Sequence, residues 1–490
     1  MTSSSRLFYK TITGLILILS FFIAFSGNVL SAASREDIHT KLIHTARKAS
    51  VSIRAKLFVG AYNTSNGWQG SGFIVNKKEG IIVTNAHIAK APSITDYIIE
   101  FHDGQKKPGK LLYYDLYRDF ALLKFDVSGI QNSVEQIDFN KDGPNENEFV
   151  FVVSNSEGRG FSFHQGYVSD IFTTSGHMSQ HSYNININTR AGASGSAVLN
   201  KEGKCLGITY AGSESYSIAL NIDYVKDAVN AFLVNKKYKR QTTGLIYSIK
   251  SLSDMLMHRN LDQKVADDYI KKFPKARGKI IAVRSTIGGY DTGLEPGDFI
   301  WSVNDKIVGP DLYHLDRIID NFNGNSIKFE VYRDGNKKVV NVNLFDVDKN
   351  KVKRMLKFAG ATFFESDDLV SRISGNRQNT IGVCSVDSNS PFASHFSFMR
   401  DVTMARILSL NGNNVTDFKS LVTTLKKIKD KKYVELSFIN YVPYETYGRT
   451  VVLDHEKITA DLVLNPADNK FQIFEFDEKK MEWVDNTQKY

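Results

Sequence analysis

Between residues 51 and 212 the chain is a succession of short apolar runs separated by turn residues. Runs of this length that are rich in valine, isoleucine and phenylalanine predict β-strands, because β-branched and aromatic side chains suit a pleated, half-buried surface. The clearest runs cover residues 51–57, 72–75, 80–84, 121–125, 148–153, 196–199 and 206–210. A helical spacing over residues 222–233 closes the region. The pattern predicts an all-β barrel or sandwich of roughly 200 residues.

A chain of 490 residues is too long for one core, and we expect about three domains. A basic stretch at residues 236–240 is the predicted linker, so the first domain covers residues 34–236. Two later units echo each other, each with strands, a sharp turn and a helix. We interpret them as copies of one small α+β module, and the remaining segments are assigned as follows: 241–346 and 354–457 for the two copies, with helices at 312–322 and 417–428, and 458–490 for a C-terminal extension.

The first 33 residues have the composition of a secretory signal. Arg6 and Lys10 form a basic start, residues 11–25 form an apolar core, and residues 31–33 supply small side chains for cleavage. An uncleaved membrane anchor is the alternative, since weak apolar character continues to Leu30. In both cases we expect the body of the protein in the periplasm or another exported compartment.

Composition and motifs exclude several classes of function. The net charge of +9 is scattered along the chain, whereas a nucleic-acid-binding protein usually concentrates it in one stripe. The two cysteines, Cys205 and Cys384, are expected in different domains as core residues, and no metal-ligand spacing can be built from them. The chain has neither a His-Glu-x-x-His motif nor a nucleotide-binding Gly-x-x-x-x-Gly-Lys motif. We therefore expect no metal, no cofactor and no use of ATP.

Three short segments carry a histidine, an aspartate and a serine in a defined order: His87 in residues 84–88, Asp119 in residues 118–123 and Ser194 in residues 192–197. This is the chain order of the chymotrypsin-like catalytic triad, whereas unrelated folds hold the same triad in other orders. We predict that Ser194 is a nucleophile, that His87 is its general base, and that Asp119 orients the imidazole. The backbone N–H groups of Gly192 and Ser194 are the predicted oxyanion hole.

The surroundings distinguish these residues from ordinary histidines, aspartates and serines. His87 directly follows a strand-like run, and Asp119 opens an apolar run where its carboxylate needs a partner. The alternative for Asp119 is a turn-capping aspartate, and Asp115 is the rival for the role in the triad. Ser194 is followed by a strand and comes after the histidine, so the nucleophile elbow of α/β-hydrolases does not fit.

On these residues the chain resembles the HtrA/Deg family of trypsin-like serine proteases. Residues 70–75 and 80–87 are similar to the family's strand pair before the catalytic histidine, residues 118–123 to its aspartate segment, and residues 166–169 to its Gly-x-Val-Ser strand. The resemblance implies a mainly β fold, with a chymotrypsin-like double β-barrel followed by two small PDZ-like domains. Residues 293–304 are similar to the PDZ signature, and Thr242, Thr243, Gly244 and Leu245 to the loop that holds a peptide carboxylate.

The resemblance also implies a function. The implied function is ATP-independent cleavage of unfolded or damaged proteins by an exported endopeptidase, whose PDZ domains capture peptide C-termini. A homo-oligomer, commonly a trimer, is implied as well, and a membrane contact only through an uncleaved leader. The strand with Thr209, Tyr210 and Ala211 is expected to wall the specificity pocket. No aspartate stands a few residues before Ser194, where it would select basic side chains. The resemblance therefore implies a preference for small-to-medium aliphatic side chains, with Tyr210 narrowing the pocket.

The chain departs from the family pattern at several positions. Ala193 precedes the serine where the family usually has asparagine, and Ala197 follows where it usually has proline. Ala193 lacks a side-chain hydrogen bond that can hold the loop in register. A second hypothesis is therefore a proteolytically weak or inactive chaperone or peptide-binding protein of the same fold, and a third is a membrane-attached PDZ scaffold. In the last unit, residues 358–361 are the candidate carboxylate loop, with a weaker match.

Overall fold

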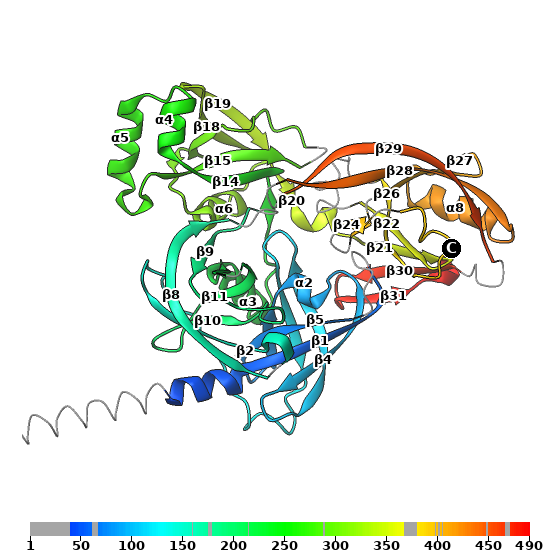
Figure 1. Cartoon of the computed structure of the whole chain (residues 1–490), viewed down its shortest axis with the longest axis horizontal. Coiled ribbons are helices and arrows are strands. Elements are labelled where there is room, and N and C mark those ends of the chain that lie inside the picture. Colours follow the sequence, from blue (N-terminus) through cyan, green and yellow to red (C-terminus); the bar gives the residue numbers. More distant parts are fainter. Residues whose placement is uncertain are drawn as a thin grey trace, which may run out of the picture.

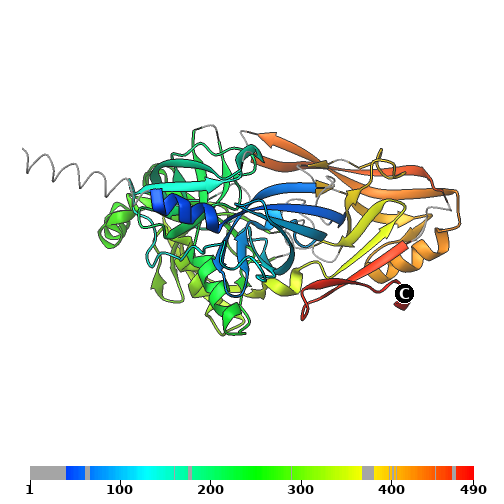
Figure 2. The same ribbon diagram turned by 90° about the horizontal axis from the view of Figure 1, so that it is seen from below.

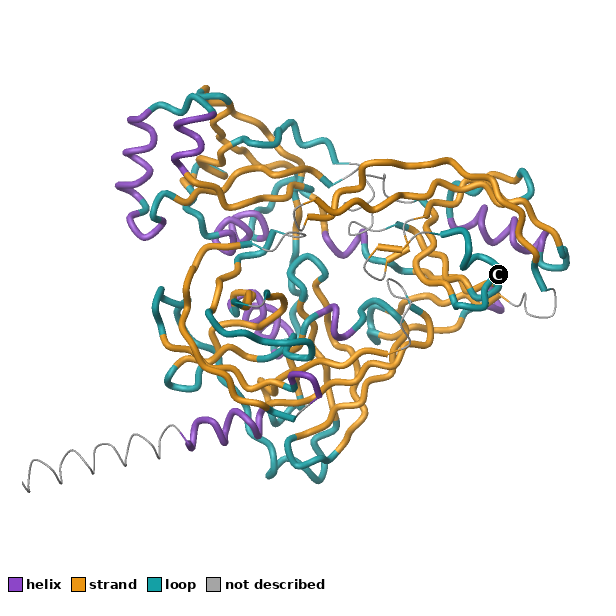
Figure 3. The backbone as a smooth tube through the Cα atoms, viewed as in Figure 1, coloured by secondary structure: helices purple, strands orange, loops and turns teal. Residues whose placement is uncertain are grey.

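The computed structural model describes residues 40–490, apart from residues 61–66, 159, 175–178, 214, 288–289, 367–379, 397, 400–401, 404, 447–448 and 466–470. The predicted leader, residues 1–33, lies outside the described residues. Strands dominate the rest of the chain (Figure 3). In the part that the structure describes, no helix has both the length and the apolar character needed to cross a membrane.

Residues 40–49 are helical and lead into the first of two closed six-stranded barrels, whose strands are joined in the order β1-β2-β3-β6-β5-β4. Its elements are β1 (Ser50–Val59), β2 (Gly67–Asn76), β3 (Ile81–Thr84), α2 (Ala86–Ala89), β4 (Ile94–Phe101), β5 (Lys106–Asp115) and β6 (Phe120–Phe125). Strand β3 is buried along its whole length, as its unbroken apolar run predicts.

The second barrel has the order β10-β11-β12-β9-β8-β7, and a helix closes it. Its elements are β7 (Phe149–Ser154), η1 (Ser156–Gly158), β8 (Ser162–Thr173), β9 (Ser182–Ile185), β10 (Ala197–Asn200), β11 (Cys205–Gly212), β12 (Ser217–Asn221) and α3 (Asp223–Leu233). One core joins the barrels, because Phe73 and Phe120 of the first pack in the same buried cluster as Phe151 and Ile208 of the second. The predicted chymotrypsin-like double barrel is thus confirmed, and a sandwich is excluded. Cys205 is buried and free, whereas the Cys384 side chain lies outside the described part.

The second unit contains a sheet with the order β14-β15-β16-β18-β19, with β17 beside β16, and its ends are tied by the pair β13 and β20. Its elements are β13 (Gln241–Thr242), β14 (Leu245–Ser251), α4 (Leu252–His258), α5 (Gln263–Lys272), η2 (Pro274–Ala276), β15 (Lys279–Thr286), β16 (Phe299–Val303), β17 (Lys306–Ile307), α6 (Leu312–Asp320), β18 (Ser326–Arg333), β19 (Asn336–Asn343), β20 (Phe345–Asp346) and η3 (Val347–Asn350). Helix α6 was expected, but α4 and α5 were not. They bury Met255 and Tyr269 against Phe299, a contact that local periodicity does not reveal.

The third unit is built on a nine-stranded sheet with the order β29-β28-β26-β23-β22-β21-β30-β31, with β27 beside β26. Its elements are β21 (Arg354–Phe358), β22 (Ala361–Glu365), β23 (Ile381–Val386), β24 (Phe398–Met399), β25 (Val402–Thr403), β26 (Ala405–Leu410), β27 (Asn413–Asn414), α8 (Phe418–Ile428), β28 (Tyr433–Thr446), β29 (Arg449–Val463), β30 (Phe471–Asp477), β31 (Glu482–Asp485) and η4 (Thr487–Lys489). The predicted helix begins after Asp417, which forms a capping box with Ser420.

Two predictions about this third unit are wrong. The boundary between 354–457 and 458–490 does not exist, since β29 crosses it and β30 pairs with β21 in the same sheet. Residues 358–361 are a tight hairpin turn in which Phe358 pairs with Ala361, so they form no carboxylate loop. Strands β21 and β22 also have neighbours on both sides, which leaves them no free edge for an added peptide strand.

In Figure 1 the second unit lies above the barrels and the third unit to their upper right, and in Figure 2 the described part of the chain is longer than it is high. The second unit rests on the second barrel through α6, and the third unit rests on the first barrel. There the Trp483 indole donates to the carbonyl oxygen of Pro92 at 2.5 Å, and Met355 and Phe364 pack with Val59. Both of the other units therefore contact the barrels.

Candidate active site

The imidazole of His87 and the carboxylate of Asp119 are in direct contact. His87 lies in α2, just after β3, and Asp119 comes directly before β6, the strand paired with β3. The Asp119 Oδ2 atom lies 2.7 Å from His87 Nδ1, and Oδ1 accepts the His87 backbone N–H at 3.0 Å. Asn85 donates to the Asp119 carbonyl oxygen at 2.9 Å. Since Asp119 accepts from Nδ1, the Nε2 atom is left as the proton acceptor that a general base needs.

Asp115, the rival for this role, has a different task. Its Oδ1 accepts the backbone N–H groups of Tyr117 and Arg118, and its Oδ2 accepts from Arg240 at 2.8 Å. The side chain is buried away from His87 and caps the turn that presents Asp119.

Residues 192–196, the loop that carries Ser194 and is called the nucleophile loop below, have the backbone features expected of an oxyanion hole. Gly192 and Gly195 have φ angles of 93° and 91°, the region that glycine adopts without strain. A Cβ at Gly195 would overlap the carbonyl oxygen of Ser71, so the close approach requires glycine. Among the described residues no acceptor contacts the backbone N–H of Gly192 or of Ser194. Both donors are free for a developing oxyanion.

Ser194 is connected to the His87 side of the site through two intermediate contacts. The backbone N–H of Ser71 donates to the Ser194 carbonyl oxygen at 2.8 Å, and the Thr84 hydroxyl donates to the Ser71 carbonyl oxygen at 2.7 Å. The structure has no hydrogen bond between the side chains of Ser194 and His87, which lie in its described part. Catalytic hydrogen bonds often tighten only when substrate binds.

A cleft of about 760 Å³ opens beside Ser194, and its walls are mostly polar. It is lined by Asn188, Thr189, Arg190, Ala191, Ser194, Thr209, Ala211, Gly212 and Ser213. Thr209 and Ala211 therefore lie where they were expected. Tyr210 does not line the cleft, so the prediction that it narrows the pocket is wrong. Its ring packs in the shared core of the barrels, and its hydroxyl lies 3.0 Å from that of Ser182. Asn188 and Thr189 were missed, because loop residues before a nucleophile have no periodic pattern.

The predicted carboxylate loop of the second unit is buried and internally bonded. The Gly244 N–H donates to the Thr242 hydroxyl at 3.0 Å, and the Leu245 N–H donates to the Thr243 hydroxyl at 3.3 Å. A PDZ loop holds a peptide carboxylate with free backbone donors. In this arrangement these two N–H groups are already occupied.

The edge of β14, where an added strand would lie, is also covered. Ser179, which follows β8 in the second barrel, accepts the Tyr247 N–H with its hydroxyl at 2.5 Å and contacts the Tyr247 carbonyl oxygen at 3.4 Å. The space left between the barrel and the loop is small, about 30 Å³. The second unit is docked through the surface that a peptide would use.

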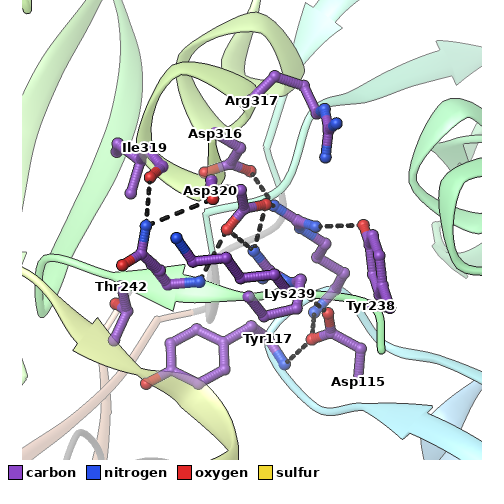
Figure 4. A network of polar contacts seen from close by, with 12 residues as sticks. Asp115, Tyr117, Tyr238, Lys239, Thr242, Asp316, Arg317, Ile319 and Asp320 are labelled. Atoms are coloured by element: carbon purple, nitrogen blue, oxygen red, sulfur yellow. Dashed lines mark hydrogen bonds and ion pairs between the residues drawn. The ribbon is translucent and has the colours of Figure 1, made fainter. Parts of the chain in front are cut away.

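A buried cluster of charges joins the second unit to the segment that carries Asp119 (Figure 4). Arg118 precedes Asp119 and pairs with Asp316 at 3.1 Å and Asp320 at 3.2 Å, both on α6. Arg240 pairs with Asp320 at 2.9 Å and with Asp115 at 2.8 Å. Burial favours the neutral acid, but Arg240 and Arg118 outweigh it for Asp115, whose pKa is lowered. For Asp316 burial prevails over the two guanidinium groups, and the pKa is raised.

Comparisons with known proteins agree with this geometry. The model of the trypsin-like peptidase domain matches residues 70–208, which span most of both barrels. An uncharacterised protein of Rickettsia prowazekii is 34% identical over 184 residues, which are 36% of this chain and 95% of that protein. The pro-apoptotic serine protease NMA111 of the yeast Vanderwaltozyma polyspora is 24% identical over 400 residues, or 78% of this chain. The chain spans about two fifths of the length of that yeast protease (39%).

Among solved structures, the HtrA-type protease AlgW with a tripeptide aligns with 63% of this chain and 97% of its own, at 19% identity and a TM-score of 0.47. The double barrel, the peptidase-domain match and the serine proteases among its relatives place the peptidase domain of this chain among the serine endopeptidases. The chain belongs to the HtrA/Deg family of trypsin-like serine proteases.

Proposed function

We propose that the chain is an active endopeptidase that cleaves unfolded or damaged proteins, without ATP, in a periplasm-like or other exported compartment. The observation that carries the proposal is the contact of His87 Nδ1 with Asp119 Oδ2 at 2.7 Å, in a fold whose nucleophile loop keeps two N–H donors free. The basic and apolar leader supports export, and the polar, open cleft beside Ser194 supports access by an extended chain. Assembly into a homo-oligomer is part of the proposal, on the family resemblance.

In this mechanism Ser194 attacks the peptide carbonyl while His87 Nε2 accepts the hydroxyl proton. Asp119 stabilises the imidazolium that forms, and the N–H groups of Gly192 and Ser194 bind the oxyanion. The imidazolium then donates its proton to the leaving amine, and water repeats the sequence to release the acyl group.

The proposal includes capture of substrate C-termini by the second unit, but only after this unit has separated from the barrel. Because Ser179 covers β14 and the loop donors are occupied, a peptide C-terminus requires this unit to separate from the barrel. Capture by the third unit is not proposed, since its candidate loop is a hairpin turn.

The test is degradation of a reduced, unfolded casein by residues 34–490 and by its Ser194→Ala variant. We expect cleavage by the parent and a loss of at least about a thousandfold in the variant, because the nucleophile is removed. Equal thermal unfolding of the two proteins provides the control for folding. Cleavage that survives in Ser194→Ala would show that Ser194 is not the nucleophile.

A second candidate function is client binding without cleavage. It is favoured by the lack of a hydrogen bond between Ser194 and His87 and by Ala193, which cannot tie the loop with a side chain. Suppression of client aggregation by a chain that cleaves nothing, with or without added C-terminal peptides, would favour this function.

A further inference from the structure

Ser71 lies in the first barrel, within Gly70-Ser71-Gly72 of β2, yet it bonds to the nucleophile loop of the second barrel. Its side chain is buried, with 1% exposure. We propose that Ser71 is the positioning residue of the oxyanion hole, holding the loop whose N–H groups stabilise the transition state. The kinetic part of this inference rests on the proposed endopeptidase activity.

Two bonds from Ser71 bracket the oxyanion donors. The Ser71 hydroxyl donates to the Gly192 carbonyl oxygen at 2.7 Å, and the Ser71 N–H donates to the Ser194 carbonyl oxygen at 2.8 Å. The two proposed donors, the N–H groups of Gly192 and Ser194, belong to the same two residues. Their carbonyl groups lie in the 192–193 and 194–195 peptide planes, which flank the 193–194 plane that carries the Ser194 N–H. Anchoring both flanking planes restricts rotation of that middle plane, and the anchored 192–193 plane also adjoins the plane that carries the Gly192 N–H.

The restriction matters because the loop's other anchor, the Gly195 N–H bond to the Thr209 carbonyl oxygen at 2.8 Å, lies after the two donors and leads back into the second barrel. Gly192 has no side chain, and its φ of 93° leaves it the freedom of glycine. Ala193 is buried but offers only a methyl group, where the family usually has an amide side chain. Its N–H donates to Arg190 O at 3.0 Å, a bond within the loop itself. Ser71 supplies an anchor from the first barrel.

Ser71 is itself fixed on the other side. Its hydroxyl accepts the Asn155 N–H at 2.9 Å, and its carbonyl oxygen accepts the Thr84 hydroxyl at 2.7 Å. A hydroxyl can donate once and accept at the same time, so serine satisfies Gly192 and Asn155 together. Alanine would leave both backbone groups without this partner. Hydrogen bonds through Ser71 therefore link Thr84, three residues before His87, to Ser194.

The experiment compares Ser71→Ala with Ser50→Ala and Ser71→Thr in the full chain. Ser50 is the matched control, since its buried hydroxyl donates to the Ala46 carbonyl oxygen at 2.8 Å and forms no hydrogen bond to the loop among the described residues. With a peptide anilide as the probe, we expect kcat of Ser71→Ala to fall by about 10- to 100-fold while KM changes by less than about threefold, because misplaced donors weaken only the transition state. Ser71→Thr, which keeps the hydroxyl, should recover most of kcat.

A merely structural role gives a different result. If Ser71→Ala and Ser50→Ala lose the same stability and the same kcat, or if Ser71→Ala retains kcat within about threefold, the proposal is overturned. Affinity for a peptide boronate, which forms a tetrahedral adduct with the serine, should fall with kcat in Ser71→Ala.

Amide hydrogen exchange separates this inference from the proposed function. In the folded variant, exchange over residues 192–196 should be at least about tenfold faster in Ser71→Ala than in the parent and in Ser50→Ala. This comparison needs no catalysis, so it holds even if the parent cleaves nothing. Equal exchange in the three proteins would overturn the positioning role while leaving the proposed function intact.

Discussion

Asp119 has a φ of 53°, a left-handed backbone conformation that few residues other than glycine, asparagine and aspartate adopt easily. The turn before β6 uses this conformation to direct the carboxylate at both the side chain and the backbone N–H of His87. Asp119 thus both forms the turn before β6 and orients His87, the general base. An asparagine fits the backbone equally well, so the two roles can be separated.

We expect Asp119→Asn to fold like the parent and to lose about 10³- to 10⁴-fold in kcat. The amide can donate to Nδ1 and so stabilise the tautomer that has its proton on Nε2, which cannot accept a proton from serine. Steady-state cleavage, with thermal unfolding of both proteins, measures the effect. Activity within tenfold of the parent would remove Asp119 from the triad.

At the scale of elements, α6 supplies charges that the barrels bury. Asp320, with 1% exposure, accepts from Arg118 and Arg240 and also from the Gln241 N–H at 2.8 Å. Two buried guanidinium groups would lose a shared partner without it. Removing one partner of a buried pair is costly, because the charge that is left has neither water nor a counter-ion.

We therefore expect Asp320→Ala to lower the free energy of unfolding by about 3–5 kcal/mol. The control is Asp334→Asn, which removes the exposed charge that pairs with Arg259 at 3.2 Å, tolerates the left-handed backbone there (φ 47°), and should cost less than about 1 kcal/mol. Urea unfolding of the variants and the parent measures both values. Similar losses of unfolding free energy in the two variants would show that the buried cluster stabilises the protein no more than an exposed ion pair does.

At the scale of the whole molecule, the third unit is held to the first barrel by its C-terminal strands. Met481 packs against the core of that barrel, and Trp483 in β31 donates to Pro92 O. Lys351, in the connection between the second and third units, donates to the Tyr114 carbonyl oxygen at 3.1 Å. The segment after residue 457 is therefore part of the interface between units.

Replacing Trp483 with alanine should loosen this interface and cost about 1–3 kcal/mol, because a half-buried indole and its hydrogen bond are lost. Tyr433→Ala is the control, since that ring is 65% exposed on the same unit. We expect faster limited proteolysis of residues 347–353 only in Trp483→Ala. Equal cleavage patterns in the two variants would mean that Trp483 does not hold the units together.

The local pattern of the sequence determined seven of the barrel strands (β1, β2, β3, β6, β7, β10 and β11), helices α3, α6 and α8, and the three segments of the candidate triad. These features depend on runs of a few residues and on glycines beside a serine, so neighbouring positions are enough to predict them. The tertiary structure alone decided the role of Ser71, whose partner Gly192 is 121 residues away, and that of Arg118, whose partner Asp320 is 202 residues away. It also decided that β30 joins β21 and that Thr242–Leu245 is closed against the barrel. Hydrogen bonds and ion pairs between distant segments arise only when packing brings them together, and no local spacing encodes them.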